Sequence, residues 1–306
     1  MGEKDMVEKI MEDYPDVFAD ILNVLLFDGK QVVRPEELSD VGLRSQFKAD
    51  TGREHEQERD VAKYWVRDGK ILAMFGLENQ TNTDRDMPMR IFSYDGSSYK
   101  SQLIKAANEG QDDARYPIIT LVLYFGEKRW GEQGVSLKGM FGGPDELQKY
   151  TQNYCVYVFE IAHLSEEELK KFRSDFGFLA EFMVCKRKAE PFRITQDKEI
   201  IHVDAVLKML SVFAEDEHVE KVSRELAKRH EKGGRIMGCN ISKAWMDLGR
   251  KEGMREGIRE GIEETSKEMN LLITYMLRDN RVEELKRSAS DSMFQEKLFK
   301  EYGLRK

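Results

Sequence analysis

The chain has 306 residues, enough for one large domain or two ordinary ones with a sizeable core. Hydrophobic residues make up 40% of it and charged residues 35%, which excludes the apolar-poor composition of a disordered chain. The formal net charge of −8 argues against a protein that binds nucleic acid over its whole surface, so any such contact must use a local basic patch.

The first 80 residues predict a helical segment followed by a β-hairpin. Residues 4–27 show an apolar repeat near 3.6 residues, interrupted at Pro15, which can open a second helix. Residues 59–66 have the composition of a strand, 67–70 (RDGK) that of a hairpin turn, and 71–80 that of a second strand rich in apolar residues.

The next hundred residues alternate between helix and strand patterns. Residues 87–110 predict a helix with a break near Gly96, and the continuous apolar run at 116–126 is typical of a strand buried on both faces. Another strand is expected at 154–164. A helix is predicted over 165–187, because that segment opens with the serine and glutamate of a capping box.

After about residue 190 only helical patterns occur. The sequence therefore predicts an α/β domain over residues 1–190, a mixed sheet flanked by helices, and an α-helical C-terminal region over 191–306. The segment 249–264 (GRKEGMREGIREGIEE) repeats glycine and glutamate every four residues. Its glycine stripe either permits close helix–helix contact and self-association or belongs to a solvated helical linker; each glycine costs about 1 kcal/mol in a helix.

Cysteine usage and hydropathy indicate where the protein works. Cys155, Cys185 and Cys239 are odd in number, widely separated and without a CxxC pair, so neither a disulfide framework nor a thiolate metal site is indicated. No apolar run of about 18 residues occurs, and the first residues lack the apolar core of a signal peptide. We expect a cytoplasmic protein that does not use a membrane.

The second strand of the hairpin ends in Glu78-x-Gln80, an unusual place for a carboxylate. Residues i and i+2 of a strand share a face, so Glu78 and Gln80 point the same way. A three-residue turn centred on Gly69 would put Asp60 directly opposite Glu78, whereas a two-residue turn would move its partner by one residue. We adopt the three-residue turn.

Two facing carboxylates repel each other by roughly 4 kcal/mol at about 4 Å for an effective dielectric constant near 20. A shared proton, a cationic side chain such as Lys63 or Arg90, or a divalent cation would offset this cost. Asp20, from the first helical segment, could add a third acid. On the residues alone, a structural ion pair and a metal site are equally good explanations of Asp60 and Glu78.

The order of these elements resembles the PD-(D/E)XK nuclease superfamily, whose shared core is an α-β-β-β-α-β arrangement. Four segments carry a narrower likeness: FADILNVLLFDGKQVVRPEEL, REHEQERD, GLENQTNTDRDMPMRIFSYDGSSY and YPIITLVLYFGEKRW, with REGIREGI in the tail. By these segments residues 10–190 resemble the Rpn family of recombination-promoting nucleases, also described as putative transposases of the YhgA-like type.

The resemblance implies a restriction-endonuclease-like core that hydrolyses phosphodiester bonds in DNA with Mg²⁺, or Mn²⁺ or Ca²⁺ in its place. Asp60 and Glu78 would be metal ligands and Asp20 the helix acid. Gln80 would take part in catalysis at the position where the superfamily has lysine; it can orient a water molecule but cannot supply a positive charge. Arg90 or Lys63 would then be needed to restore that charge.

The expected function is therefore that of a metal-dependent DNA endonuclease linked to recombination, mobile elements or defence. Its partners would be DNA and further copies of the chain, which would assemble through the helical tail. The alternative is a catalytically weak or inactive relative that uses the nuclease fold and the tail as a binding and oligomerising module.

Overall fold

The computed structural model describes residues 3–41, 44–48, 54–58, 60–109, 115–131, 134–190, 192, 194 and 197–305. The chain divides into two compact units, Met1–Trp245 and Met246–Lys306. The first unit contains a mixed β-sheet with helices on both faces, and the second contains helices only. An α/β domain followed by a helical region was predicted, and the structure confirms that coarse architecture.

The sheet of the first unit has five strands in the order β1-β4-β5-β6-β7. These strands are β1 (Leu38–Asp40), β4 (Val61–Arg67), β5 (Lys70–Gln80), β6 (Ile118–Tyr124) and β7 (Tyr157–Glu160). The first three pair antiparallel, while β5–β6 and β6–β7 pair parallel. A separate antiparallel ladder joins β2 (Arg44–Lys48) to β3 (Glu54–Glu58).

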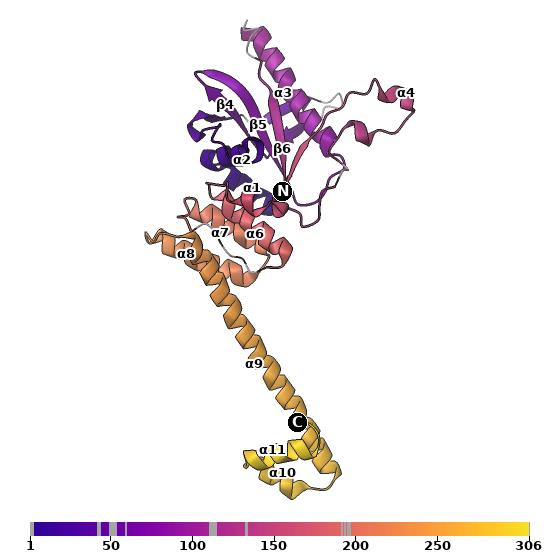
Figure 1. The fold of residues 1–306 in the computed structure, drawn as a ribbon, viewed down its shortest axis with the longest axis vertical. Coiled ribbons are helices and arrows are strands. Elements are labelled where there is room, and N and C mark those ends of the chain that lie inside the picture. The colour runs from indigo at the N-terminus through magenta and orange to yellow at the C-terminus, as the bar shows by residue number, and fades with distance from the viewer. Residues whose placement is uncertain are drawn as a thin grey trace. The chain divides into compact units, whose positions relative to one another are not determined.

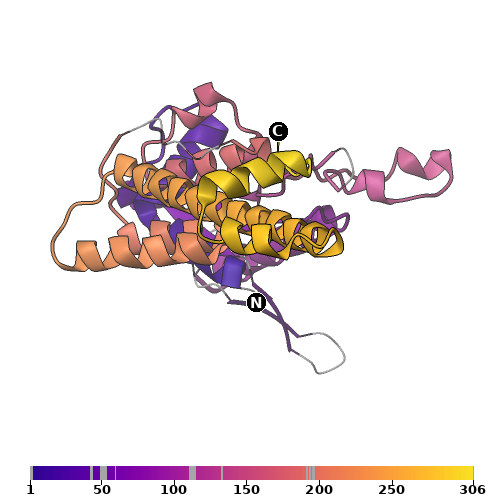
Figure 2. The same cartoon turned by 90° about the horizontal axis from the view of Figure 1, so that it is seen from below.

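Helices cover both faces of this sheet (Figure 1). The helices of the first unit are α1 (Glu3–Asp13), α2 (Pro15–Phe27), α3 (Met87–Glu109), α4 (Asp145–Gln148), α5 (Glu166–Leu169), α6 (Phe176–Lys188), α7 (Val203–Ala214) and α8 (Glu217–Glu231), with short 3₁₀ turns η1 (Pro35–Glu37), η2 (Lys138–Met140) and η3 (Ile161–His163). The segment around α4 projects away from the sheet in both views (Figure 2).

Alternation along the central strands creates the two apolar layers. Leu121 and Leu123 of β6 face the main core, to which α1, α2, α6 and α7 contribute. Val122 and Tyr124 face a smaller cluster that includes Ile91 of α3. Residues of β6 on both faces are therefore buried, which confirms the prediction from its continuous apolar run.

The hairpin between β4 and β5 closes with a two-residue turn, so the predicted three-residue turn was wrong. Asp68 and Gly69 have φ angles of 52° and 72°, the left-handed conformation that this kind of turn requires. A β-bulge follows at Trp65/Val66, where the register shifts by one residue. Beyond the bulge Val61 pairs with Leu77, which is the register that the three-residue turn had predicted for this end of the hairpin.

Two predicted elements differ from the observed ones. Helix α3 runs through Gly96 without a break, because packing against the sheet holds the helix around that residue, with Asp95 buried and bonded to the hydroxyl of Thr120. The strand predicted over 154–164 is reduced to β7 and is followed by η3.

The helix predicted over 165–187 is two helices. The capping box of Ser165 and Glu168 is present and opens α5, but α5 ends at Leu169 and α6 starts at Phe176. Between them the backbone N–H groups of Arg173 and Ser174 donate to Asp20 Oδ2 at 2.8 and 2.7 Å. These donors bind a side chain of α2 and do not continue a helical ladder.

The first compact unit extends past the predicted boundary at residue 190. Helix α7 buries Val206, Leu207 and Leu210 in the same apolar core as α1 and the sheet. Because this apolar face is needed to complete the core, α7 belongs to the α/β unit although the sequence there reads as helix only.

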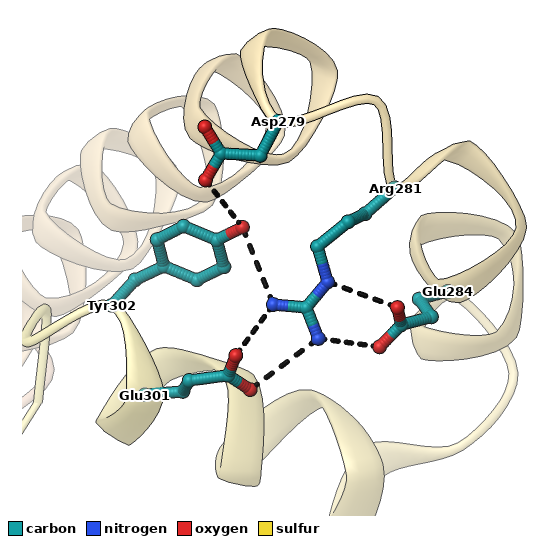
Figure 3. Close-up of polar contacts among 5 residues, drawn as sticks. All are labelled: Asp279, Arg281, Glu284, Glu301 and Tyr302. Atoms are coloured by element: carbon teal, nitrogen blue, oxygen red, sulfur yellow. Dashed lines mark hydrogen bonds and ion pairs between the residues drawn. The ribbon is translucent and has the colours of Figure 1, made fainter.

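The second unit is a small helical assembly. Helix α9 (Gly238–Arg278) enters it from the first unit, and α10 (Val282–Ser288) and α11 (Ser292–Glu301) complete it around a core of Leu272, Met276, Leu298 and Phe299. Arg281 links these helices, binding Glu284 at 2.9 and 2.5 Å and Glu301 at 2.5 Å (Figure 3). Such a bidentate arginine fixes the orientation of neighbouring helix ends.

The four-residue repeat lies in the middle of α9, as a continuous helix. A Cβ atom added at Gly249, Gly253, Gly257 or Gly261 would meet no described atom within 4 Å. Met254, Ile258 and Ile262, which we call the apolar row, are 71%, 53% and 63% exposed. None of the helices that the structure describes combines the length and the apolar character needed to cross a bilayer.

Candidate functional site

The carboxylate of Asp60 lies at the end of the β4–β5 hairpin, immediately before β4. Its Oδ2 accepts the backbone N–H of Asn79 at 2.7 Å, and its Oδ1 forms an ion pair with Lys9 Nζ at 2.9 Å. The first contact joins Asp60 to the strand end that carries Glu78 and Gln80. That the carboxylates of Asp60 and Glu78 face each other stays a prediction.

Glu78 is buried and is held by an arginine from α3. Arg90 Nη2 lies 2.5 Å from Glu78 Oε1, and Arg90 Nη1 lies 2.8 Å from Asp84 Oδ2. Burial by itself would lower the pKa of Arg90, but hydrogen bonds to Asp84 and Tyr94 and the charge of Glu78 raise it above its ordinary value. A permanently charged guanidinium thus neutralises Glu78. A cationic side chain was one of the explanations of Glu78 that the sequence left open.

The adjacent residue of β5 points to the opposite face of the sheet. Asn79 Nδ2 donates to Glu12 Oε2 of α1 at 2.8 Å, and Glu12 is fully buried. Burial raises the pKa of Glu12 well above its usual value; the hydrogen bond from Asn79 lowers it in part, and the charges of Glu8 and Asp60 raise it further. Glu12 is therefore an acid of this region that sequence reasoning missed.

A sequence signal for Glu12 did exist. Glu8 and Glu12 are four residues apart in α1 and lie on the face that also buries Val7 and Met11. Two acids on the apolar face of a helix are expensive to bury unless other groups compensate them. This pair of acids in α1, and not Asp20 in α2, is therefore the sequence signal for the acid that a helix brings to this end of the sheet.

Asp20, the predicted helix acid, has other partners. Its Oδ2 accepts the N–H groups of Arg173 and Ser174 in the link between α5 and α6. Burial raises the pKa of Asp20, and these hydrogen bonds together with the charge of Lys198 act in the opposite direction. Asp20 thus organises a loop, and its described hydrogen bonds do not involve Asp60, Glu78 or Glu12.

Replacement of Asp20 by alanine is expected to destabilise the protein by about 2–4 kcal/mol, because the buried N–H group of Ser174 and the partly buried one of Arg173 lose their acceptor. The same change should leave any response to divalent cations intact, since the carboxylate does not contact Asp60. Urea unfolding with and without Mn²⁺ checks both points. A selective loss of the cation response in a folded Asp20→Ala protein would restore Asp20 to the site.

The two remaining sequence-level candidates also have defined places. Gln80 is the last residue of β5, opposite Tyr124 of β6 and only partly buried. Lys63 lies in β4, with its ammonium group 2.9 Å from Asp13 and 2.6 Å from Asp40. Of the two cationic side chains proposed for the site, Arg90 therefore forms an ion pair with Glu78, while Lys63 binds other carboxylates.

These contacts give the region the oxygen donors that Mg²⁺ prefers, namely carboxylates and a side-chain amide. Glu12 Oε1 and Asn79 Oδ1 are buried and accept no hydrogen bond from the described residues, so a cation near them would relieve a desolvation cost. Against this, the described residues contain no group of three or more His, Cys, Asp or Glu side chains arranged to hold a metal ion.

Glu12→Gln should change how stability depends on pH. Because the folded-state pKa of Glu12 is raised, the native protein binds this proton more tightly than the unfolded chain, so stability falls as the pH rises from about 4.3. The variant lacks this loss and becomes more stable relative to wild type toward alkaline pH. Urea unfolding across the acid to alkaline range tests this, and parallel stability curves for the two proteins would contradict it.

The candidate site is thus one end of the β4–β5 hairpin with α1 on one face and α3 on the other. It contains Asp60 with Lys9, Glu78 with Arg90, and Asn79 with Glu12. Compared with models of protein families, with curated proteins and with solved structures, the chain matches none.

Proposed function

We propose that the chain is a divalent-metal-dependent DNA endonuclease with a restriction-endonuclease-like core, related to the Rpn-type nucleases that its sequence resembles. The element order of the main sheet supports this: helices α1 and α2, the antiparallel strands β1, β4 and β5, with the separate β2–β3 ladder inserted after β1, helix α3, and then β6 parallel to β5. That is the helix, three-strand, helix, strand order of the PD-(D/E)XK superfamily, with α1 and α3 on opposite faces of the sheet.

One observation carries the proposal: Asp60 Oδ2 accepts the N–H of Asn79 at 2.7 Å. This bond brings the carboxylate of Asp60, the residue before β4, to the backbone of the residue that follows Glu78, which supports a shared site for the two acids. Such a pair is the minimum that a metal-dependent phosphodiesterase needs to bind a cation beside its substrate.

The proposed roles follow from these positions. Asp60 and Glu78 would hold the cation. Glu12, which reaches this strand end from the opposite face through Asn79, would be the acid that the first helical segment contributes to the region in place of Asp20. A bound Mg²⁺ or Mn²⁺ would offset the negative charge that develops on the phosphate and lower the pKa of a bound water. Gln80 would orient the attacking water through its side-chain amide, which donates and accepts hydrogen bonds but carries no charge.

Purified wild-type protein incubated with supercoiled plasmid tests the proposal. We expect nicked or linear DNA with Mg²⁺ or Mn²⁺ and intact plasmid with a chelator, because cleavage depends on the cation. Failure to cut with Mg²⁺, Mn²⁺ or Ca²⁺ would reject the nuclease function and favour the second candidate.

The second candidate is a catalytically inactive module that binds a partner through the same fold. Its supporting observation is that the protein's own cations neutralise both acids, Lys9 at Asp60 and Arg90 at Glu78. A ligand that binds only the folded state raises its stability. An increase in melting temperature with Mn²⁺ that is lost in Asp60→Asn therefore favours the enzyme, and an unchanged melting temperature favours the module.

The proposed setting is the cytoplasm, with DNA as substrate and self-association through the helical tail. All three cysteines are free thiols, which suits a reducing compartment. The exposed apolar row on α9 runs beside the open glycine row, a combination that lets two helices approach closely. Recombination, mobile elements or defence against foreign DNA remain the proposed biological role.

A further inference from the structure

A pocket lies between β7, the last strand of the sheet, and the segment that follows β6. Its volume is about 610 Å³, which falls in the range of pockets that hold small ligands. We call it the β7 pocket. Its lining combines apolar, aromatic and charged side chains, among them Arg129, Trp130, Val156, Tyr157, Val158 and Glu160. None of these residues takes part in the described contacts of Asp60 and Glu78, so the β7 pocket is a second site in the first unit.

Trp130 and Glu160 place the β7 pocket on the face of the sheet that carries Gln80. Gln80 pairs with Tyr124 of β6, and Tyr124 pairs with Glu160 of β7, so the three side chains share a face. Trp130 joins them, because its ring meets the ring of Tyr124 edge-on with 5.0 Å between the centroids. Neighbouring strands lie about 4.8 Å apart, so Glu160 is roughly 10 Å across the sheet from Gln80, which shares its face with Glu78.

Arg129 supplies the β7 pocket with a positive charge that solvent can reach. Its side chain is 67% exposed, and its Nη1 donates to Oε2 of Glu160. Burial would raise the pKa of Glu160, but the hydrogen bonds from Arg129 and from the backbone of Trp130 outweigh burial and lower that pKa. The carboxylate is therefore charged and holds the arginine in place. A guanidinium has five N–H donors, so Arg129 can bind a phosphate group without leaving Glu160.

Tyr157 supplies an aromatic ring that a ligand can reach. It is 58% exposed, while Trp130 in the same lining is 6% exposed. Proteins bind single-stranded nucleic acid with aromatic rings, on which the bases stack, and with cations that contact the phosphates. Tyr157 and Arg129 bring these two kinds of group to one pocket. The lining therefore suits an unpaired nucleotide.

Contacts at both ends of β7 argue against a peptide strand in the β7 pocket. The N–H of Val156 donates to the carbonyl of Val135 at 3.0 Å, and the N–H of Trp130 donates to Glu160 Oε1 at 2.6 Å. Strands rise about 3.3 Å per residue, so roughly 13 Å of chain lie between Val156 and Glu160. A peptide added along the edge of β7 would meet these contacts at both ends, whereas a single nucleotide can lie between them.

We propose that the β7 pocket binds an unpaired nucleotide of the DNA strand that is cut, with the base stacked on Tyr157 and a phosphate at Arg129. This inference rests on the proposed nuclease function and adds a substrate class to it, namely DNA with unpaired nucleotides close to the cleaved bond. A paired base would first have to leave the duplex, which costs free energy, so a single strand or a gap enters the β7 pocket more readily than intact duplex.

The first test measures binding of a short fluorescent oligothymidine and of a duplex of the same length, by anisotropy, with a chelator present to prevent cleavage. Tyr157→Ala should weaken binding of the single strand about 5- to 100-fold, because one stacked base loses its platform, and should leave duplex binding unchanged. Tyr157→Phe keeps the ring and should bind like wild type. Tyr150→Ala, which removes a 72% exposed tyrosine outside the pocket, is the matched control and should also bind like wild type.

A chain of the same length with abasic sugars separates stacking from a general loss of binding. This chain keeps the phosphates and has no bases, so Tyr157→Ala should bind it as tightly as wild type does. The cost of the substitution thus appears only when a base is present.

Arg129→Gln tests the phosphate contact. The logarithm of the binding constant for oligothymidine falls linearly with the logarithm of the salt concentration. The slope should become shallower by about 0.7 in this variant, because one phosphate contact is lost. Arg224→Gln, which breaks an exposed ion pair with Glu220 in α8, is the matched control and should keep the wild-type slope. An unchanged slope in Arg129→Gln would show that Arg129 serves only its ion pair with Glu160.

The outcomes separate this inference from the proposed function. If wild type does not bind the single strand, or if folded Tyr157→Ala binds it as tightly as wild type, the β7 pocket is no nucleotide site and the inference is overturned, while plasmid cleavage still decides the nuclease function. If Tyr157 is needed for binding of the single strand but wild type cuts no DNA with any divalent cation, the nucleotide site is supported and the nuclease function fails.

Discussion

Glu78→Gln is expected to reduce cation-dependent DNA cleavage by about 10³-fold or more, the largest effect expected of any single substitution on β5. The amide keeps the size of the side chain and an oxygen for Arg90, but it removes the negative charge that a metal ligand needs. Glutamine is the informative change because alanine would also leave Arg90 without its buried partner.

The matched control for Glu78→Gln is Glu37→Gln. Glu37 also pairs with an arginine: its two carboxylate oxygens accept hydrogen bonds from Arg67 and Trp65, which lower its pKa to about 2. Glu37 is the last residue of η1, just before β1, so loss of its charge should leave cleavage unchanged. The cleavage rates of the two folded variants are compared with that of wild type. Equal rates for Glu78→Gln and wild type would show that Glu78 has no catalytic role.

Lys63→Ala is expected to destabilise the first unit by about 2–5 kcal/mol, whereas Lys63→Met should cost less than about 1.5 kcal/mol. Asp13 and Asp40 are largely exposed and regain water when the ammonium group is lost, so the charges themselves contribute little. The main loss in alanine is the buried aliphatic stem, which packs below an ammonium group 5.8 Å from the ring centroid of Phe18.

Urea unfolding of the two Lys63 variants measures this difference. If Lys63→Met and Lys63→Ala lower the free energy of unfolding equally, the ion pairs, and not the packed aliphatic stem, stabilise this region. Plasmid cleavage should be unaffected in Lys63→Met, because Lys63 binds Asp13 and Asp40 and has no part in the proposed chemistry.

The β-hairpin and the buried strand β6 were predictable because strand periodicity and the Asp-Gly turn act locally. The register at the far end of the hairpin, where Val61 pairs with Leu77, was also predicted, but through a compensation. A two-residue turn alone would have displaced the pairing, and the bulge at Trp65/Val66 restored it. The position of a β-bulge depends on tertiary packing and on the twist of the sheet, so it cannot be predicted from sequence spacing.

The identity of the helix acid could not be chosen from sequence spacing. Asp20 and Glu12 both lie on buried faces of the first helical segment, and only the loop between α5 and α6 decides that Asp20 binds Arg173 and Ser174. That loop is more than 150 residues away along the chain. The contact between Lys9 and Asp60 is hidden for the same reason, since it depends on how α1 packs across the hairpin end.

The extent of the first unit depended on tertiary contacts as well. Helix α7 follows a purely helical stretch of sequence, and nothing local distinguishes it from the tail helices. Its apolar face completes the core beside α1, and Ile241 and Trp245 at the start of α9 pack against the same core, so the compact unit ends at Trp245.

Plasmid cleavage by Asp60→Asn beside wild type, in Mg²⁺ or Mn²⁺, tests the central proposal most directly. Asparagine keeps an oxygen for the N–H of Asn79 and removes only the charge, and Asp28→Asn, which breaks the pair with Lys171, is the matched control. We predict that wild type and Asp28→Asn cut, and that Asp60→Asn is slower by about 10³-fold or more. Cleavage by folded Asp60→Asn at the wild-type rate would contradict a nuclease site at this end of the hairpin.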